Sequence, residues 1–306
     1  MLVTGAGGFV GAAALASLAR GGHEVHAIST RPRPHASGVM WHTADLHVAD
    51  AAHELMALVR PEQLLHLAWY AEHGRYWTSV ENVRWVEATL RLLRAFADQG
   101  GVRAVVAGTC AEYDWELQSE FLSEDSTPLR PATLYGACKD ATRRIGEALA
   151  DEAGFALAWG RIFFVYGPGE TGDRLVPSVV TALLEKRPAR VTEGLQVRDF
   201  MHVHDVGAAF VALLDSDVHG AVNIGSGEGV TVRHVVEAVG AATGCPDLIE
   251  FGGVATRPGE PAAIVADVGR LRDEVGFLPR TSLRDGVQQT VEWWQARPDS
   301  ISVESV

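Results

Sequence analysis

The sequence predicts an α/β protein built on a parallel sheet that helices cover on both faces. Short apolar runs typical of strands alternate with Ala- and Leu-rich stretches of helical periodicity along roughly the first half of the chain. A glycine-rich turn follows the first apolar run, where a strand passes into a helix. Beyond about residue 166, Gly and Pro separate shorter segments, which indicates a second, smaller α/β unit.

The strands are the most clearly marked elements. We expect them at residues 2–4, 25–29, 64–68, 104–108 and 157–165, with helices over 12–20 and 83–97. This order predicts a first domain over residues 1–166, with returning segments near 200–225, and a smaller domain over 167–199 and 226–306. The tail after Trp293 and Trp294 is expected to fray.

Composition and charge limit the class of partner. The 306 residues are 47% hydrophobic and 21% charged, as expected for a globular chain with a sizeable core. The net charge is −13 and no basic stripe occurs, so we expect neither nucleic acid nor an anionic membrane as a partner. No apolar run approaches the ~20 residues of a membrane helix. Because Cys110, Cys138 and Cys245 form neither a disulfide framework nor metal-ligand spacing, we expect a cytoplasmic protein without a metal.

Gly5, Gly7, Gly8 and Gly11 define the turn in the segment TGAGGFVG. Gly5 permits a sharp turn, Gly8 lets the backbone approach a pyrophosphate, and Gly11 lets the helix pack closely against the strand. A tight turn that binds nothing is the alternative. The T-G-x-x-G-F-x-G spacing resembles the extended branch of the short-chain dehydrogenase/reductase superfamily, whose members handle nucleotide sugars. The resemblance implies a Rossmann-type doubly wound sheet, an NAD(P) cofactor in the first domain, a nucleotide-diphosphate sugar in the smaller one, and a homodimer.

The end of the second strand distinguishes NAD from NADP in proteins of this kind. A carboxylate there binds the ribose of NAD, whereas an arginine pairs with the 2′-phosphate of NADP. The sequence has Ser29, Thr30 and Arg31 at this point, with no carboxylate. We therefore expect NADP(H) in preference to NAD(H), with Arg31 binding the phosphate and Arg33 as a solvated loop charge. The expected cofactor contacts outside the catalytic residues are Gly5, Gly7, Gly8, Phe9, Val10, Gly11, Ser29, Thr30, Arg31, Asp45, Leu46, Leu67 and Ala68.

A tyrosine and a lysine are the strongest catalytic candidates. Tyr135 and Lys139 lie four residues apart, so a helix places both side chains on one face. A nearby ammonium favours the phenolate and lowers the tyrosine pKa from its usual value of about 10. Thr109 ends a strand-like run, and strand ends are where sheets of this type form sites. A surface pair and a strand-end hydroxyl are the alternatives. The resemblance implies a catalytic triad of Thr109, Tyr135 and Lys139, in which Tyr135 and Lys139 also contact the cofactor.

The two residues after Thr109 decide which reaction the resemblance favours. Nucleotide-sugar 4,6-dehydratases carry Asp-Glu there, and this sequence has Cys110 and Ala111, so we do not expect dehydration. The string GTCAEYD resembles segments of CDP-abequose/paratose synthases, which reduce a 4-keto sugar. The expected function is NADPH-dependent reduction of a nucleotide-linked 4-keto-6-deoxyhexose in deoxysugar biosynthesis. A nucleotide-sugar epimerase is the nearest alternative because it shares these residues, and a non-catalytic nucleotide-binding regulator is a remote one.

Arginines and aromatic residues are the expected substrate contacts. Arg198 in RDFMHVHDV and Arg257 in RPG match the family's pattern, and two guanidiniums suit a diphosphate. A loop-tying ion pair is the alternative for Arg198. The segment HLAWY departs from the usual H-L-A-A and places Trp69 and Tyr70 where they face the sugar, form a lid or plug the core. Glu112 either orients a substrate hydroxyl or caps the backbone. The full expected set is Trp69, Tyr70, Glu112, Tyr113, Arg174, Arg198 and Arg257.

Two further expectations concern packing. His66, inside a predicted strand, is expected to be a packed core histidine rather than a ligand. The stripe Val83, Val86, Leu90 and Leu93 is a candidate dimer face, although the same spacing serves any core helix.

Overall fold

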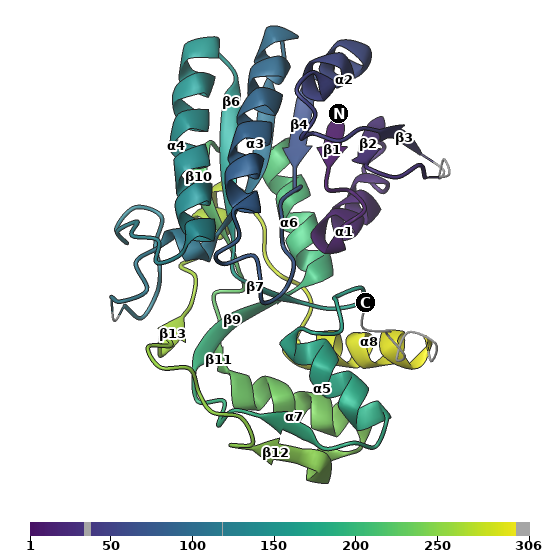
Figure 1. The fold of residues 1–306 in the computed structure, drawn as a ribbon, viewed down its shortest axis with the longest axis vertical. Helices are drawn as coiled ribbons and strands as arrows, with labels where there is room; N and C mark the ends of the chain where they lie inside the picture. Colours follow the sequence, from purple (N-terminus) through teal and green to yellow (C-terminus); the bar gives the residue numbers. More distant parts are fainter. Residues whose placement is uncertain (34–37, 118, 298–306) are drawn as a thin grey trace.

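A seven-stranded sheet, in the upper part of Figure 1, carries the glycine-rich turn. The structure is a computed structural model that describes residues 1–33, 38–117 and 119–297, so the tail expected to fray lies largely outside the described residues. All neighbouring strands of this sheet are parallel. In spatial order they are β10 (Gly220–Ile224), β6 (Ala156–Ile162), β5 (Arg103–Thr109), β4 (Gln63–His66), β1 (Leu2–Thr4), β2 (Val25–Ser29) and β3 (Val39–Thr43). The strand order reverses between β1 and β4, the position where sheets of this type bind ligands.

Helices cover both faces of the sheet, which confirms the predicted doubly wound fold. The helices α1 (Phe9–Leu18) and α6 (Val203–Asp215) pack on one face, and α2 (Ala51–Val59), α3 (Glu81–Asp98) and α4 (Leu134–Ala153) on the other. Phe210 and Leu213 of α6 join a buried cluster with Val105 of the sheet. Leu92 and Phe96 of α3 form a second cluster on the opposite face. Each helix therefore buries one apolar stripe against the strands.

Some boundaries differ from those expected. The run 157–165 forms two strands, β6 in the large sheet and β7 (Phe164–Tyr166) in another. The Phe163 N–H still bonds the carbonyl of Ile224 in β10 at 3.1 Å, and from Phe164 onward the chain pairs with β9 instead. The strand β3 was not predicted, and the run 64–68 is a strand only to His66.

The remaining elements form a smaller α/β unit below the sheet in Figure 1. The strand β7 pairs with β9 (Val197–His202), which also pairs with β11 (Gly229–Thr231) and β13 (Ala263–Ile264), while β8 (Ala189–Val191) pairs with β12 (Ile249–Phe251). The helices α5 (Leu175–Leu184), α7 (Val232–Thr243) and α8 (Leu283–Gln295) bury Val180, Val236 and Trp294 in one shared cluster. Three short helices complete the described chain: the 3₁₀ helices η1 (Cys110–Glu112) and η2 (Pro246–Leu248) and the π-helix η3 (Arg270–Glu274).

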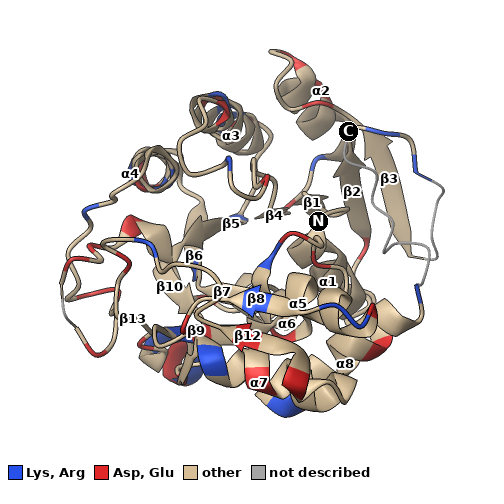
Figure 2. Ribbon diagram, turned by 60° about the horizontal axis from the view of Figure 1, so that its bottom comes forward, with Lys and Arg blue, Asp and Glu red and all other residues tan. Residues whose placement is uncertain are grey.

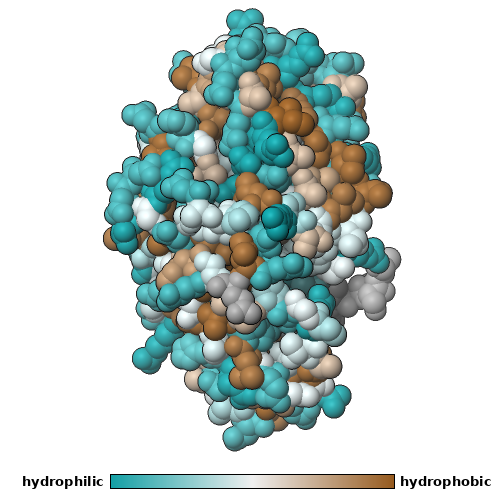
Figure 3. Space-filling view, turned by 90° about the vertical axis from the view of Figure 1, so that its left-hand side faces the viewer, coloured by the Kyte–Doolittle hydropathy of each residue, from teal (hydrophilic) through white to brown (hydrophobic). Residues whose placement is uncertain are grey.

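The surface carries mixed charge and scattered apolar groups. Basic and acidic residues are interspersed around the molecule (Figure 2), and none of the helices described is long and apolar enough to cross a membrane. Seen from the side of α4, apolar groups lie among polar ones (Figure 3). Within the expected dimer stripe, Val83 is exposed but Leu93 packs in the core, so the whole stripe does not form a surface.

Candidate active site

The glycine-rich turn lies at the point where the strand order reverses. Gly5 has φ +64°, and a Cβ there would lie 2.6 Å from the backbone nitrogen of Ala68, two residues after β4. A Cβ on Gly11 would collide with the carbonyl of Gly5. Gly8 caps α1 without a side-chain hydrogen bond, and the first turn holds no acidic residue. The turn thus fits a dinucleotide phosphate, because it presents helix N–H groups that no carboxylate of that turn neutralises.

Most of the other expected cofactor contacts lie at the carboxyl edge of the sheet, but the side chain of one is buried in the core. Leu67 and Ala68 pack directly on Gly5. The Ser29 hydroxyl accepts the backbone N–H of Arg31 at 3.2 Å, and the Asp45 carboxylate accepts that of His47 at 2.9 Å. The expected contacts therefore gather at the carboxyl edge of the sheet. Leu46 differs, because its side chain is buried in the core beneath α2.

Arg33, rather than Arg31, reaches the glycine turn. A Cβ on Gly7 would meet the guanidinium of Arg33, which also lies 5.1 Å from the ring centroid of Trp41. Both arginines are exposed, and the described hydrogen bond of Arg31 is made by its backbone. The loop after β2 therefore brings the second arginine, and not the first, beside the turn, and the assignment of the 2′-phosphate contact to Arg31 stays a prediction.

The triad residues come together at the ends of β5 and the start of α4. Thr109 is the last residue of β5, and its side chain hydrogen-bonds that of Tyr135. The helix α4 starts just before Tyr135 because Thr133 caps it, accepting the Gly136 N–H at 3.2 Å. One turn later, the Lys139 ammonium donates to the carbonyl of Ala107 in β5 at 2.7 Å.

Lys139 is 3% exposed and is enclosed by aromatic rings. Its Nζ lies 3.8 Å from the ring centroid of Trp69 and 5.9 Å from that of Trp159. Burial lowers the pKa of Lys139 to about 7, and the nearby Glu112 carboxylate opposes this shift. The ammonium is therefore in balance with the neutral amine near neutral pH.

Burial controls the acidity of Tyr135. It raises the pKa of the phenol above its ordinary value; the neighbouring Tyr76 adds to this rise and the hydrogen bond with Thr109 opposes it. Burial thus outweighs the lowering expected from Lys139, whose ammonium bonds the carbonyl of Ala107. Tyr135 holds its proton at neutral pH and is suited to donate it.

An aromatic enclosure surrounds Tyr135. The rings of Tyr76 and Trp77 meet its ring edge-on, with centroids 4.9 Å and 5.8 Å away. Trp115 extends the enclosure, 6.0 Å from Trp77. Sequence reasoning missed Tyr76 and named Tyr70, whose hydroxyl instead donates to Glu72 at 2.7 Å. The aromatic run between residues 69 and 77 was a signal, but the turns within it decide which rings face the site.

Two of the expected substrate arginines lie by this enclosure. Arg174 donates to the carbonyl of Ala71 at 3.2 Å and hydrogen-bonds Tyr76. The exposed Arg257 lies within electrostatic range of Tyr76. Arg198 is 4% exposed and pairs with Glu260 at 3.0 Å, and its charge also acts on the thiol of Cys110 beside the triad. Arg174 and Arg257 therefore bring positive charge close to the enclosure, whereas Arg198 forms the loop-tying ion pair that was its alternative.

Glu112 and Tyr113 lie behind the triad and do not face a substrate. The carboxylate of Glu112 is 0% exposed and accepts from the Thr109 N–H at 2.9 Å and from the Trp159 indole at 2.8 Å. It also pairs with Arg161 at 2.8 Å. The Tyr113 hydroxyl is buried between Arg161 and Asn223. These bonds correct the expectation that both residues contact the substrate and favour the capping interpretation of Glu112. His66 is a packed core histidine, as expected, bonded to two threonine hydroxyls.

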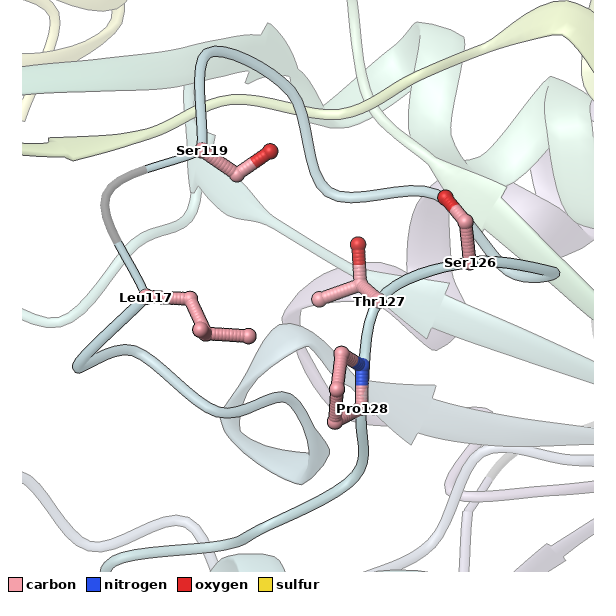
Figure 4. Close-up of a pocket in the computed structure, with 5 residues that line it drawn as sticks. All are labelled: Leu117, Ser119, Ser126, Thr127 and Pro128. Atoms are coloured by element: carbon pink, nitrogen blue, oxygen red, sulfur yellow. The ribbon is translucent and has the colours of Figure 1, made fainter.

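A shallow hollow lies on the loop that follows η1 (Figure 4). It is lined by Leu117, Ser119, Ser126, Thr127 and Pro128. The Ser119 hydroxyl donates to the carbonyl of Phe121 at 2.6 Å, and that of Thr127 accepts the Ser123 N–H at 2.8 Å. These hydroxyls serve the loop itself, so the hollow offers no acid–base group. Within the described ranges, no three His, Cys, Asp or Glu residues are grouped to hold a metal.

The fold and the site together define a class: a dinucleotide-binding α/β protein with a Thr, a Tyr and a Lys at the carboxyl edge of its sheet. The chain belongs to the NAD-dependent epimerase/dehydratase family, whose model matches residues 1–225. The cofactor is accordingly of the NAD(P) type.

Relatives match along nearly the whole chain. A UDP-glucose 4-epimerase of Streptomyces lividans is 30% identical over 97% of this chain and 96% of its own. The structure of MoeE5 in complex with UDP-glucuronic acid and NAD is 31% identical, with TM-score 0.83 over 96% of this chain and 98% of that chain. The fold is also that of a UDP-glucose 4-epimerase from Thermotoga maritima, at TM-score 0.86 and 23% identity over 96% and 98% of the two chains.

Proposed function

We propose that this protein reduces a nucleotide-linked 4-keto-6-deoxyhexose with NADPH. The observation that carries the proposal is the placement of Arg33 against Gly7, in a loop after β2 that offers a cation and no carboxylate. The placement of the Tyr135 phenol beside Thr109 also supports reduction, because a keto group that gains hydride needs a proton donor.

The residues of the site have separate roles in this reaction. The dinucleotide supplies hydride when bound. Tyr135 donates the proton to the sugar oxygen, and Thr109, already hydrogen-bonded to the phenol, stabilises negative charge as it develops on that oxygen. Lys139 provides positive charge on the same helix face, and Tyr76 with Trp77 excludes water from the phenol.

A nucleoside diphosphate suits the positive charge beside the enclosure. Arg174 and Arg257 supply guanidiniums that pair with phosphate oxygens, while Arg198 is already paired with Glu260. The sugar nucleotides named with the relatives, UDP-glucose and UDP-glucuronic acid, are of this chemical class. We further propose a cytoplasmic homodimer formed through α3 and α4, where Val83 and Ile145 are exposed.

A keto-sugar assay tests the function directly. With a nucleotide-linked 4-keto-6-deoxyhexose, we expect oxidation of one NADPH for each sugar reduced. The loss of reduced-nicotinamide absorbance measures the NADPH oxidised, and mass spectrometry identifies the product. Omitting the sugar is the control. Product formation without net NADPH oxidation contradicts the proposal.

A nucleotide-sugar 4-epimerase is the second candidate. The relatives favour it, because UDP-glucose 4-epimerases match nearly the whole chain. An epimerase interconverts UDP-glucose and its 4-epimer with no net consumption of cofactor, whereas the proposed reductase leaves UDP-glucose unchanged. Incubation of the protein with UDP-glucose and each dinucleotide therefore separates the two candidates.

The choice of dinucleotide yields a specific prediction. Replacing Arg33 by Ala removes a charge-assisted contact to the 2′-phosphate, so the Kd for NADPH is expected to rise by about 10–100-fold. The Kd for NADH changes little, because NADH lacks that phosphate. Arg31→Ala is the matched control and leaves both values near those of the parent protein. Fluorescence titration measures the Kd values for NADPH and NADH in the parent protein and in both variants. A larger loss of NADPH affinity in Arg31→Ala contradicts this assignment.

A further inference from the structure

The environment of Lys139 holds little that stabilises a buried cation. An ammonium has three donors, and in the described structure Nζ has a hydrogen bond to one carbonyl, that of Ala107. Within residues 1–33, 38–117 and 119–297, no carboxylate forms an ion pair with it. Glu112 is the nearby anion, but its oxygens accept from Thr109, Trp159 and Arg161. A charge buried with so few partners is costly.

The indole of Trp69 occupies the place that a further partner would take. The ammonium lies 3.8 Å from the centroid of this ring, and the face of an indole attracts cations more strongly than other aromatic rings do. The contact is stronger away from water, and Lys139 is almost fully buried.

Helix α3 holds the Trp69 ring in this orientation. The indole N–H donates to the side-chain oxygen of Asn82 at 2.9 Å, and the ring stacks on Trp85 at 6.1 Å between centroids. Asn82 is itself buried, and its amide donates to the carbonyls of Tyr76 and Ser79 at 2.7 Å and 2.8 Å. The ring is therefore fixed by the same segment that forms the aromatic enclosure.

The other titratable groups that face Lys139 do not supply this stabilisation. His66 on β4 is neutral, because burial lowers its pKa to about 3 and the charge of Lys139 adds to the shift. Tyr135 on the same helix keeps its proton, because burial raises its pKa. The charge of Glu112 on η1 raises the pKa of Lys139 from a distance, but its carboxylate forms its ion pair with Arg161. The face of Trp69 remains as the close contact suited to the charged form.

We propose that Trp69 is a positioning residue, whose ring face holds the Lys139 side chain in place and favours its charged form. This residue stands where the family pattern has alanine, which offers no such face, so the arrangement belongs to this chain. The proposal rests on the proposed function only in that Lys139 serves the reaction; the Trp69–Lys139 contact itself is independent of which sugar is used.

The low lysine content of the chain makes this contact directly measurable. Lys139 and Lys186 are the two lysines of the sequence, so protein labelled with carbon-13 at the lysine ε-carbon gives two side-chain signals by NMR. Lys186→Arg assigns them, because Lys186 lies away from the site beside Cys245. Titration of the Lys139 signal then reports its pKa without any substrate or turnover.

Two variants separate the ring face from simple packing. Trp69→Leu and Trp69→Phe both lose the bond to Asn82, but Phe keeps an aromatic face. We expect the pKa of Lys139 to fall by about one unit in Trp69→Leu and by less than about half a unit in Trp69→Phe. The alkaline limit of kcat/KM with the keto sugar should move down in the same order, because an uncharged Lys139 no longer assists Tyr135.

The NMR titration decides the proposal even if the proposed reaction fails. Equal pKa values in the Leu and Phe variants, or no shift in either, would show that the ring face does not stabilise the ammonium and overturn it. A shifted pKa in a protein that does not reduce keto sugars would uphold this inference and refute the proposed function alone. Unchanged amide spectra elsewhere confirm that both variants are folded.

Discussion

Tyr135→Phe is expected to lower kcat for keto-sugar reduction by about 10²–10⁴-fold, the contribution of a positioned proton donor. Burial raises the pKa of the Tyr135 phenol, so it carries a proton at neutral pH, and its oxygen is hydrogen-bonded to Thr109. Phenylalanine keeps the edge-on packing against Tyr76 and Trp77, so the enclosure and the helix should persist. The Kd for NADPH is expected to stay within about twofold, because ring packing and Lys139 are retained.

Single-turnover and steady-state kinetics measure this effect, with fluorescence titration for the cofactor. Tyr70→Phe is the matched control, because its hydroxyl bonds Glu72 outside the triad. That variant should retain the parent kcat. Activity of Tyr135→Phe near the parent value would remove Tyr135 from the proton transfer, and loss of NADPH binding would indicate that the phenol serves the cofactor instead.

The parts of the fold that were predicted depend on local patterns. The first two strands and the glycine turn follow from apolar runs and from glycines that sit where a Cβ would collide, as at Gly11. The division of residues 157–165 into β6 and β7 could not be predicted, because the break at Phe163 depends on pairing with β9 and β10, which lie far along the chain. The strand β3 lies at the edge of the sheet, where none of its five residues is buried, and its apolar run is limited to Val39, Met40 and Trp41.

The candidate site was predictable where spacing alone sets geometry. One helical turn joins Tyr135 to Lys139, and a strand end places Thr109, so these three residues come together as expected. The direction in which a loop side chain points could not be predicted from the sequence. Arg33 reaches the turn because of the path the loop takes after β2, and Tyr76 faces the phenol because of turns between residues 70 and 80.

Glu112 illustrates a second limit of prediction from sequence, because the sequence alone does not distinguish a glutamate that contacts a ligand from one that caps the backbone. The structure places both carboxylate oxygens in internal bonds, with Thr109 and Trp159 on one and Arg161 on the other. The Thr109 hydroxyl in turn accepts the Ala111 N–H at 3.2 Å. These reciprocal bonds form a capping box that fixes the end of β5 relative to the short helix η1. The carboxylate therefore holds Thr109 in register with Tyr135 rather than touching the sugar.

Glu112→Gln tests this role through stability. The amide keeps the shape of the side chain but leaves the guanidinium of Arg161, which is 1% exposed, without its counter-charge. Breaking one partner of a buried ion pair typically costs about 3–5 kcal/mol, so we expect Tm to fall by roughly 5–10 °C in thermal unfolding. Glu116→Gln on the exposed side of the same loop is the control and should leave Tm unchanged. If Glu112→Gln instead raised KM for the sugar nucleotide at constant Tm, the carboxylate would be a substrate contact. The buried position of all its partners makes the loss of stability the expected result.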